Sequence, residues 1–189
     1  MRRIWDCFDW VHIENWHLRE STTVKRTLQL AKELKIPVSL NLFSVRSVQN
    51  CKEILLNLIP SYVDVLFGNE EEICALTGLK PQESCLMLQN LYPLVVATLG
   101  SNGCLIAHQG RAIQVPTFST QVVDTTGAGD FFAAGFIYGI LNHYPVDTCG
   151  LIGNRLGSAI IEVIGASLPQ EKWDEVLQFI HKIPNPRDS

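Results

Sequence analysis

The chain has 189 residues, of which 47% are hydrophobic and 18% charged, enough for one sizeable core in a single domain. Its formal net charge of -4 gives no basic field that would attract nucleic acid or anionic lipid. Six dispersed cysteines without a C-x-x-C pair predict reduced thiols and a cytoplasmic location, and no apolar stretch is long enough for a signal peptide or a membrane span. We therefore expect neither a nucleic acid nor a membrane as a partner.

The first part of the chain alternates strand-like and helix-like segments. Ser21 or Thr22 can cap a helix that carries apolar residues on one face. Pro37 prevents this helix from continuing into residues 38–43, which are apolar enough for a buried strand. A helix is thus followed by a buried strand.

The middle of the chain repeats the pattern. Ser47 is the expected cap of a second helix, after which β-branched and aromatic residues over 62–67 predict another strand. An acidic helix over residues 70–77 should end at Gly78, because glycine suits a left-handed helix cap. The apolar run over 94–99 predicts the next strand.

The last part is mostly helical. Short strands over 104–107 and 111–115 are joined by a turn, and helices are expected over residues 130–142, 148–164 and 172–183. Strands that alternate with helices predict an α/β fold with a doubly wound, largely parallel sheet and helices on both faces. Ligands of such sheets bind at the carboxyl ends of the strands.

One run, VVDTTGAGDFFAAGF over residues 122–136, predicts a strand end, a glycine-rich turn and the start of a helix. The backbone of Gly127, Ala128 and Gly129 can approach an anion closely, with N–H groups at the positive end of that helix. Fixed N–H donors stabilise a transferring phosphoryl group, and the Asp130 carboxylate can accept the proton of an attacking hydroxyl. The run therefore predicts phosphoryl transfer to an alcohol. A tight turn capped by Asp130 before a buried helix is the alternative that needs no ligand.

The same run resembles the C-terminal signature D-T-x-G-A-G-D of the ribokinase (PfkB) family of carbohydrate and nucleoside kinases. The resemblance implies a ribokinase-like fold, ATP with Mg2+ as phosphoryl donor, Asp130 as base, residues 127–129 as anion hole, and a sugar or nucleoside as acceptor. It extends from about Val11 to Ile183, covers only the C-terminal part of a family member, and implies that residues 11–16 are the mid-domain strand. Residues 39–43 lack the Asp and Asn pattern of many sugar kinases and are slightly closer to adenosine-kinase-like members.

An acidic element follows the predicted strand over 62–67. Asn69 and Glu72 resemble the family's N-x-x-E element, which implies that the carboxylate holds Mg2+ through water, since Mg2+ prefers oxygen ligands and keeps much of its hydration shell. A solvated helix start stabilised by the helix dipole is the alternative for the same residues.

A second element matches the family's T-x-G-x-x-G turn, which lines the nucleotide phosphates and ribose. The matching residues are Thr98, Gly100, Ser101 and Gly103. A hairpin-type turn is the alternative. The resemblance also places Asn154 beside the adenine, although a lone helix asparagine is more often a surface or capping residue.

The family binds a monovalent cation next to the signature. By resemblance, Asp124 and Thr126, with main-chain carbonyls near Ile160, Val163 and Gly165, would bind K+ and stiffen the loop without touching substrate. A proline falls near the place where some members supply another polar ligand, which leaves the cation dependence open.

The resemblance implies that residues 1–189 are the C-terminal portion of a kinase domain. This portion would contain the nucleotide site and the catalytic loop but not the lid and first strands. The expected function is that of an ATP-dependent kinase acting on a sugar or nucleoside hydroxyl. The alternative is a truncated or split noncatalytic fragment that binds nucleotide and needs the missing N-terminal segment or a homodimer partner. A P-loop ATPase is disfavoured because G-x-x-x-x-G-K-[ST] is absent.

Overall fold

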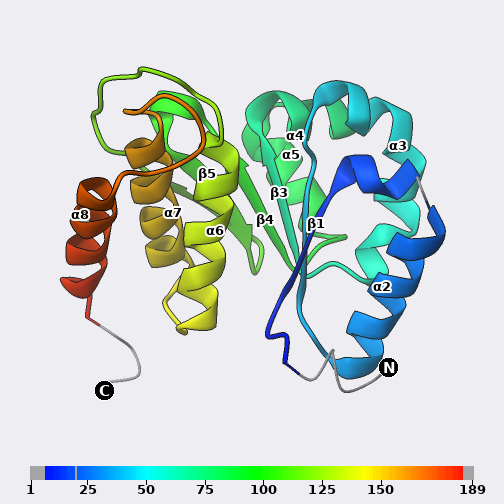
Figure 1. Ribbon diagram of the computed structural model, residues 1–189. Helices are drawn as coiled ribbons and strands as arrows, with labels where there is room; N and C mark the ends of the chain where they lie inside the picture. Colours follow the sequence, from blue (N-terminus) through cyan, green and yellow to red (C-terminus); the bar gives the residue numbers. More distant parts are fainter. Residues whose placement is uncertain (1–6, 20, 185–189) are drawn as a thin grey trace. The chain divides into compact units, whose positions relative to one another are not determined.

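The computed structural model describes residues 7–19 and 21–184. Its strands are β1 (Val11–Glu14), β2 (Val38–Asn41), β3 (Val65–Asn69), β4 (Leu94–Thr98), β5 (Cys104–His108) and β6 (Arg111–Val115), ordered β1-β2-β3-β4-β5-β6 in one sheet. The helices are α2 (Ser21–Leu34), α3 (Val45–Asn57), α4 (Glu70–Thr77), α5 (Pro81–Leu88), α6 (Ala128–Leu141), α7 (Val146–Ile160) and α8 (Gln170–His181). Short 3-10 turns are η1 (Asn15–Arg19), η2 (Ile59–Ser61) and η3 (Gly100–Asn102). Figure 1 shows these elements along the chain. A mostly parallel sheet flanked by helices confirms the predicted α/β class.

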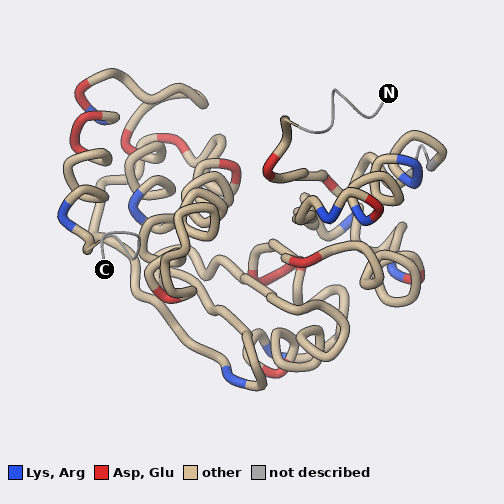
Figure 2. Tube along the Cα trace, turned by 90° about the horizontal axis from the view of Figure 1, so that it is seen from below, with Lys and Arg blue, Asp and Glu red and all other residues tan. Residues whose placement is uncertain are grey.

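The chain divides into two compact units. The N-terminal unit contains residues 1–98 and 107–112, and the C-terminal unit contains residues 99–106 and 113–189. Lys and Arg positions are dispersed among Asp and Glu positions in each unit (Figure 2). Within the described part of the chain, we find no helix with both the length and the apolar character that a membrane crossing requires.

The N-terminal unit is built on four parallel strands. β1 pairs with β2, β2 with β3 and β3 with β4, all in parallel register. Leu40, Leu66 and Val95 lie on three successive strands and are buried, because helices cover the sheet and leave the central strands no solvent face. Parallel pairing brings the carboxyl ends of all four strands to one edge, where ligands of such sheets bind.

Two local predictions for this unit need correction. Ser44, not Ser47, caps α3: its side chain accepts a hydrogen bond from the Ser47 N–H at 3.1 Å. Helix α5 was not expected, although Pro81 at its first position is a typical helix start. The left-handed cap at Gly78 is confirmed, with φ of 82°.

Tight helix packing organises the C-terminal unit. A Cβ added at Gly135 would lie 3.0 Å from the Gly153 Cα, and one added at Gly139 would lie 2.8 Å from Cys149 Sγ. These glycines therefore let α6 and α7 run side by side at close distance, and α8 packs on α7 (Figure 1).

The segment before the signature differs from the prediction. β6 ends at Val115, and residues 116–127 form no strand, so the expected strand end at residues 122–123 is wrong. Helix α6 begins at Ala128, two residues earlier than expected, and α7 ends at Ile160, four residues earlier than expected. The first residues of the signature therefore lie in a long irregular segment, whose position must be fixed by contacts with other parts of the chain.

Candidate active site

At the carboxyl edge of the N-terminal unit, Asn69 and Thr98 are register partners at the ends of β3 and β4. Asn69 caps α4: its Oδ1 accepts from the Glu72 N–H at 2.9 Å, while Glu72 Oε2 accepts from the Asn69 N–H at 3.0 Å. Asn69 Nδ2 also donates to Glu72 Oε1 at 2.9 Å. The structure thus brings Asn69, Glu72 and Thr98 to one edge, as the N-x-x-E and threonine motifs require, and the reciprocal cap fixes the carboxylate.

Glu72 is buried, with 5% of its surface exposed. Burial raises the pKa of this carboxyl above its ordinary value, and the nearby Glu14 charge raises it further, against the lowering effect of the Asn69 N–H. A buried carboxylate next to a second one is a costly arrangement that a cation would relieve.

Glu14 is a candidate that the sequence reasoning missed. It ends β1 opposite Asn41, whose Nδ2 donates to Glu14 Oε1 at 3.3 Å, and His12 Nε2 lies 3.3 Å from the same oxygen. Its other oxygen, Oε2, is buried without a hydrogen-bond partner among the described residues. Glu14 falls inside the segment 11–16 that the family resemblance assigns to a strand, so the sequence did not mark it as the last residue of β1.

These carboxylates fit Mg2+ in donor chemistry, because Mg2+ binds oxygen ligands and retains several waters. Glu72 and Glu14 supply oxygens, one of which has no partner in the described structure. The described residues contain no cluster of three or more His, Cys, Asp or Glu side chains with metal-ligand geometry. Water and phosphate oxygens would therefore complete the shell of such an ion.

In the C-terminal unit, Gly127 caps α6 with φ of 79° and ψ of 1°, a conformation that favours glycine. The Ala128 N–H donates to Thr125 O at 3.2 Å, so it is already engaged. The N–H groups of Gly127, Gly129 and Asp130 have no acceptor among the described residues. Three unengaged N–H groups at a helix N-terminus provide the positive end that an anion requires.

Asp130 lies in the first turn of α6 and is exposed. Within residues 7–19 and 21–184, no ion pair or hydrogen bond of its side chain is found. The Asp130 carboxylate is therefore available to a ligand. A salt bridge that would neutralise it is absent from the described contacts.

Asp124 connects the signature to the turn after α7. Its Oδ2 accepts from the Gly165 N–H at 2.9 Å, and its Oδ1 accepts from the Thr126 N–H at 2.9 Å and from Thr126 Oγ1 at 2.7 Å. These hydrogen bonds, that from Gly165 first, lower the pKa of the Asp124 carboxyl. The Ile160 carbonyl accepts from the Val163 N–H at 3.2 Å. Asp124 is thus joined directly to Thr126 and Gly165, while Ile160 and Val163 pair with each other, and K+ binding stays a prediction.

The turn after Thr98 contains η3. The Leu99 N–H donates to Gly103 O at 2.7 Å, and both Gly100 and Gly103 have positive φ, of 55° and 84°. A Cβ at Gly103 would lie 2.0 Å from Val115 O, so the fold itself requires this glycine, whereas a Cβ at Gly100 would meet nothing within 4 Å. Ser101 in this turn is exposed.

Asn154 has an environment different from the expected one. It is buried, and its Nδ2 donates to Val115 O and Pro116 O, both at 3.1 Å. The Asn154 amide therefore holds the end of β6 on α7. This structural role accounts for the side chain without a nucleotide. Convergence of Asn69, Glu72 and Thr98 with the signature loop stays a prediction.

The sequence pattern of the pfkB family carbohydrate kinases matches residues 7–173. The chain belongs to this family. It is 48% identical over 129 residues to an uncharacterized sugar kinase of Archaeoglobus fulgidus, covering 66% of this chain and 48% of that protein. It is 33% identical over 181 residues to the adenosine kinase of Schizosaccharomyces pombe, covering 86% of this chain and 52% of that protein.

Solved structures of kinases share the fold of this chain. The structure of adenosine kinase from Sinorhizobium meliloti superposes with a TM-score of 0.87 at 23% identity, covering 95% of this chain and 57% of that one. The ribokinase-like fold is thereby shown. The chain spans about half the length of the relatives it matches.

Proposed function

We propose that this chain carries the nucleotide site and catalytic base of an ATP-dependent kinase that phosphorylates a hydroxyl of a sugar or nucleoside. The observation that carries the proposal is the exposed Asp130 carboxylate, one residue from the unengaged Gly129 N–H on the same helix turn. Family membership supports the reaction class, and the names of the relatives support both acceptor classes.

In this proposal, Asp130 accepts the proton of the acceptor hydroxyl as that oxygen becomes a nucleophile. The N–H groups of Gly127, Gly129 and Asp130 stabilise negative charge on the phosphoryl oxygens, at the positive end of α6. Glu72 would hold Mg2+ through water, with Glu14 as a second oxygen donor, and Asn69, Thr98, Gly100, Ser101 and Gly103 would line the nucleotide. When bound, Mg2+ would neutralise charge on the phosphates of ATP.

Asp130→Asn tests the base assignment, because asparagine keeps the size of the side chain and cannot accept the proton. We expect phosphotransfer from Mg2+-ATP to adenosine, ribose or fructose to fall by about 100-fold or more, the usual contribution of a general base. Equal turnover of Asp130→Asn and the parent chain, measured with the upstream family segment supplied in trans, would refute the assignment.

Nucleotide binding without turnover is the second candidate function for this chain, which spans about half the length of the relatives it matches. Acceptor positioning and water exclusion carry much of the rate in phosphoryl transfer, and both depend on the lid of the family. The 189-residue chain alone should bind Mg2+-ATP weakly and transfer phosphate little faster than background. Robust turnover by the chain alone, abolished in Asp130→Asn, would contradict this candidate. A second copy of the chain is the alternative partner to the upstream segment.

K+ binding at Asp124 and Thr126, and a cytoplasmic location, belong to the same proposal. The location rests on the six dispersed cysteines without a C-x-x-C pair, which favour a reducing compartment. Replacing K+ by tetramethylammonium should weaken Mg2+-ADP binding if the cation stiffens the loop, and unchanged affinity would exclude the cation from the site.

A further inference from the structure

The irregular segment over residues 116–127, here called the approach segment, connects β6 to α6 and ends in the signature glycines. A segment of this length without secondary structure is ordinarily mobile, yet the N–H groups at its end must hold a fixed geometry to bind an anion. Contacts from α7, α8 and the turn between them supply the missing constraint.

The beginning of the approach segment is held on α7 and α8. Thr117 Oγ1 lies 3.0 Å from Ser158 Oγ. The Phe118 ring packs edge-on against Phe179 with centroids 5.2 Å apart, and the Arg155 guanidinium lies 5.8 Å from the Phe118 ring centre. One aromatic side chain is thus held between the two helices.

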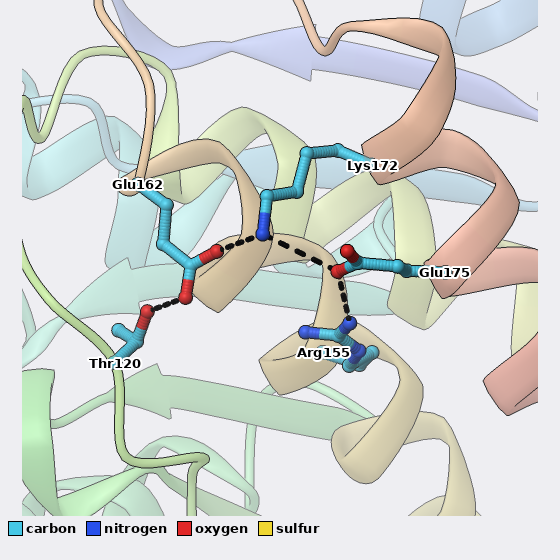
Figure 3. A network of polar contacts seen from close by, with 5 residues as sticks. All are labelled: Thr120, Arg155, Glu162, Lys172 and Glu175. Atoms are coloured by element: carbon cyan, nitrogen blue, oxygen red, sulfur yellow. Dashed lines mark hydrogen bonds and ion pairs between the residues drawn. The ribbon is translucent and has the colours of Figure 1, made fainter.

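A polar network continues from this point (Figure 3). Thr120 Oγ1 donates to Glu162 Oε1, and Lys172 Nζ donates to Glu162 Oε2 at 2.5 Å. Glu175 Oε2 accepts from Lys172 Nζ and from Arg155 Nη2, both at 3.3 Å. The two cations, Lys172 and Arg155, balance the charge of the two carboxylates. Without the lysine, Arg155 alone would offset both negative charges.

Three of the four charged side chains in this network are partly shielded, whereas Glu175 is 51% exposed. Lys172, Glu162 and Arg155 are 28%, 26% and 17% exposed, so water screens these contacts less than it screens an ordinary surface pair. Because it is a network of several partly shielded charges, it can hold a loop where a single exposed pair would not.

The same turn also reaches the signature. Ile161, the neighbour of Glu162, accepts through its carbonyl from the Val123 N–H at 2.7 Å and from the Asp124 N–H at 3.2 Å. Trp173, the neighbour of Lys172, contacts the Phe131 ring, with centroids 6.0 Å apart. Glu162 and Lys172 therefore each lie one residue from a contact to the signature.

We propose that Lys172 and Glu162 are positioning residues that clamp the approach segment through Thr120 and so fix the anion-binding N–H groups at the start of α6. The role of these residues in the reaction rests on the proposed function. Neither side chain needs to touch the nucleotide: displacement of the loop by about 1 Å is enough to lower activity strongly.

The test uses the full 189-residue chain and two readouts: hydrogen exchange of residues 121–130, and the affinity for Mg2+-ADP by calorimetry. Lys172→Met keeps the aliphatic stem, and Glu162→Gln keeps an acceptor for Thr120 but removes the ion pair. Matched controls are Arg26→Met and Glu33→Gln, which break the exposed Arg26–Glu33 pair (3.7 Å) in the N-terminal unit.

We expect exchange of residues 121–130 to accelerate and Mg2+-ADP affinity to fall, each by about three- to fivefold, in Lys172→Met and Glu162→Gln. Neither control should change either readout. Lys172→Arg should keep both readouts at the parent level, because arginine keeps a cation that can pair with Glu162 and Glu175.

Unchanged exchange in Lys172→Met would overturn the clamp, and faster exchange with unchanged affinity would overturn its positioning role. A parent chain without affinity for Mg2+-ADP would overturn the proposed function instead, and the exchange data would then decide the clamp alone.

Discussion

Asn69 and Glu72 cap the same helix reciprocally: each side chain accepts a hydrogen bond from the backbone N–H of the other, at 2.9 and 3.0 Å. The exchange satisfies two orphan donors at the start of α4. It also fixes a buried carboxylate at the carboxyl edge of the sheet, next to the end of β4. One local motif therefore serves the fold and, in the proposed function, the metal.

Glu72→Gln should separate these two roles. Glutamine keeps one carbonyl oxygen for the Asn69 N–H, and it removes the cost of a buried charge whose pKa burial raises. Because the pKa of this carboxyl is raised in the folded chain, the stability of the fold decreases as the pH rises above the ordinary pKa of the group. The neutral glutamine does not carry this cost at pH 7. We expect the Tm to change by less than about 3 °C, which for a domain of this size is about 1 kcal/mol.

The same variant should lose the Mg2+ dependence of ADP binding, measured by calorimetry with and without the metal. A variant that unfolds contradicts the expected stability, and a folded variant that keeps the full Mg2+ dependence contradicts the assignment of Glu72 to the metal.

Gly129→Ala should uncouple stability from binding in the signature. Gly129 lies in the first turn of α6, and a Cβ added there would meet nothing within 4 Å, so the fold does not require glycine. Alanine should leave stability unchanged or raise it by about 0.5–1 kcal/mol through helix propensity. The added methyl should weaken Mg2+-ADP binding, if a phosphate approaches the backbone at this residue.

Gly135→Ala is the opposite control in the same helix, because its Cβ would lie 3.0 Å from Gly153. It should lower stability in chemical denaturation, since overpacking costs about 1–3 kcal/mol. If Gly129→Ala and the parent chain bind Mg2+-ADP with equal affinity, the phosphate does not approach the backbone at this residue.

Asn154→Ala should destabilise the chain without a specific effect on nucleotide. Removing the buried amide leaves the Val115 and Pro116 carbonyls without their donor, at a cost of about 1–3 kcal/mol. Asn142→Ala, which removes an exposed hydrogen bond to Tyr138 O, should stay within about 0.5 kcal/mol. A loss of Mg2+-ADP affinity by folded Asn154→Ala, measured well below its Tm, would return this residue to the site.

Buried thiols should limit stability in alkali. Burial raises the pKa of Cys85, Cys104 and Cys149 from 9.0 to about 12. The unfolded thiols release protons near their ordinary value while the folded ones retain them, so stability is full below pH 9 and falls as pH rises toward 12. Urea unfolding at a series of pH values checks this decline. Alkylation of these thiols at pH 8 as fast in the native chain as in urea would contradict their protection.

The sequence by itself determined the features that are local. The acidic start of α4, the left-handed cap at Gly78 and the glycine run before Asp130 depend on residues within about one helix turn, so composition and spacing predicted them. The alternation of apolar strands with amphipathic helices likewise predicted the parallel α/β class and allowed the family resemblance to be placed.

Tertiary structure decided what depends on contacts far apart in the sequence. Glu14 becomes a site candidate only because β1 pairs with β2 beside Asn41, and Asn154 is buried because two carbonyls almost 40 residues away need its amide. The clamp joins Thr120 to Glu162 and Lys172 across 42 and 10 further residues. Such hydrogen bonds and ion pairs leave no periodic pattern in the chain, because their geometry exists only after the helices have packed.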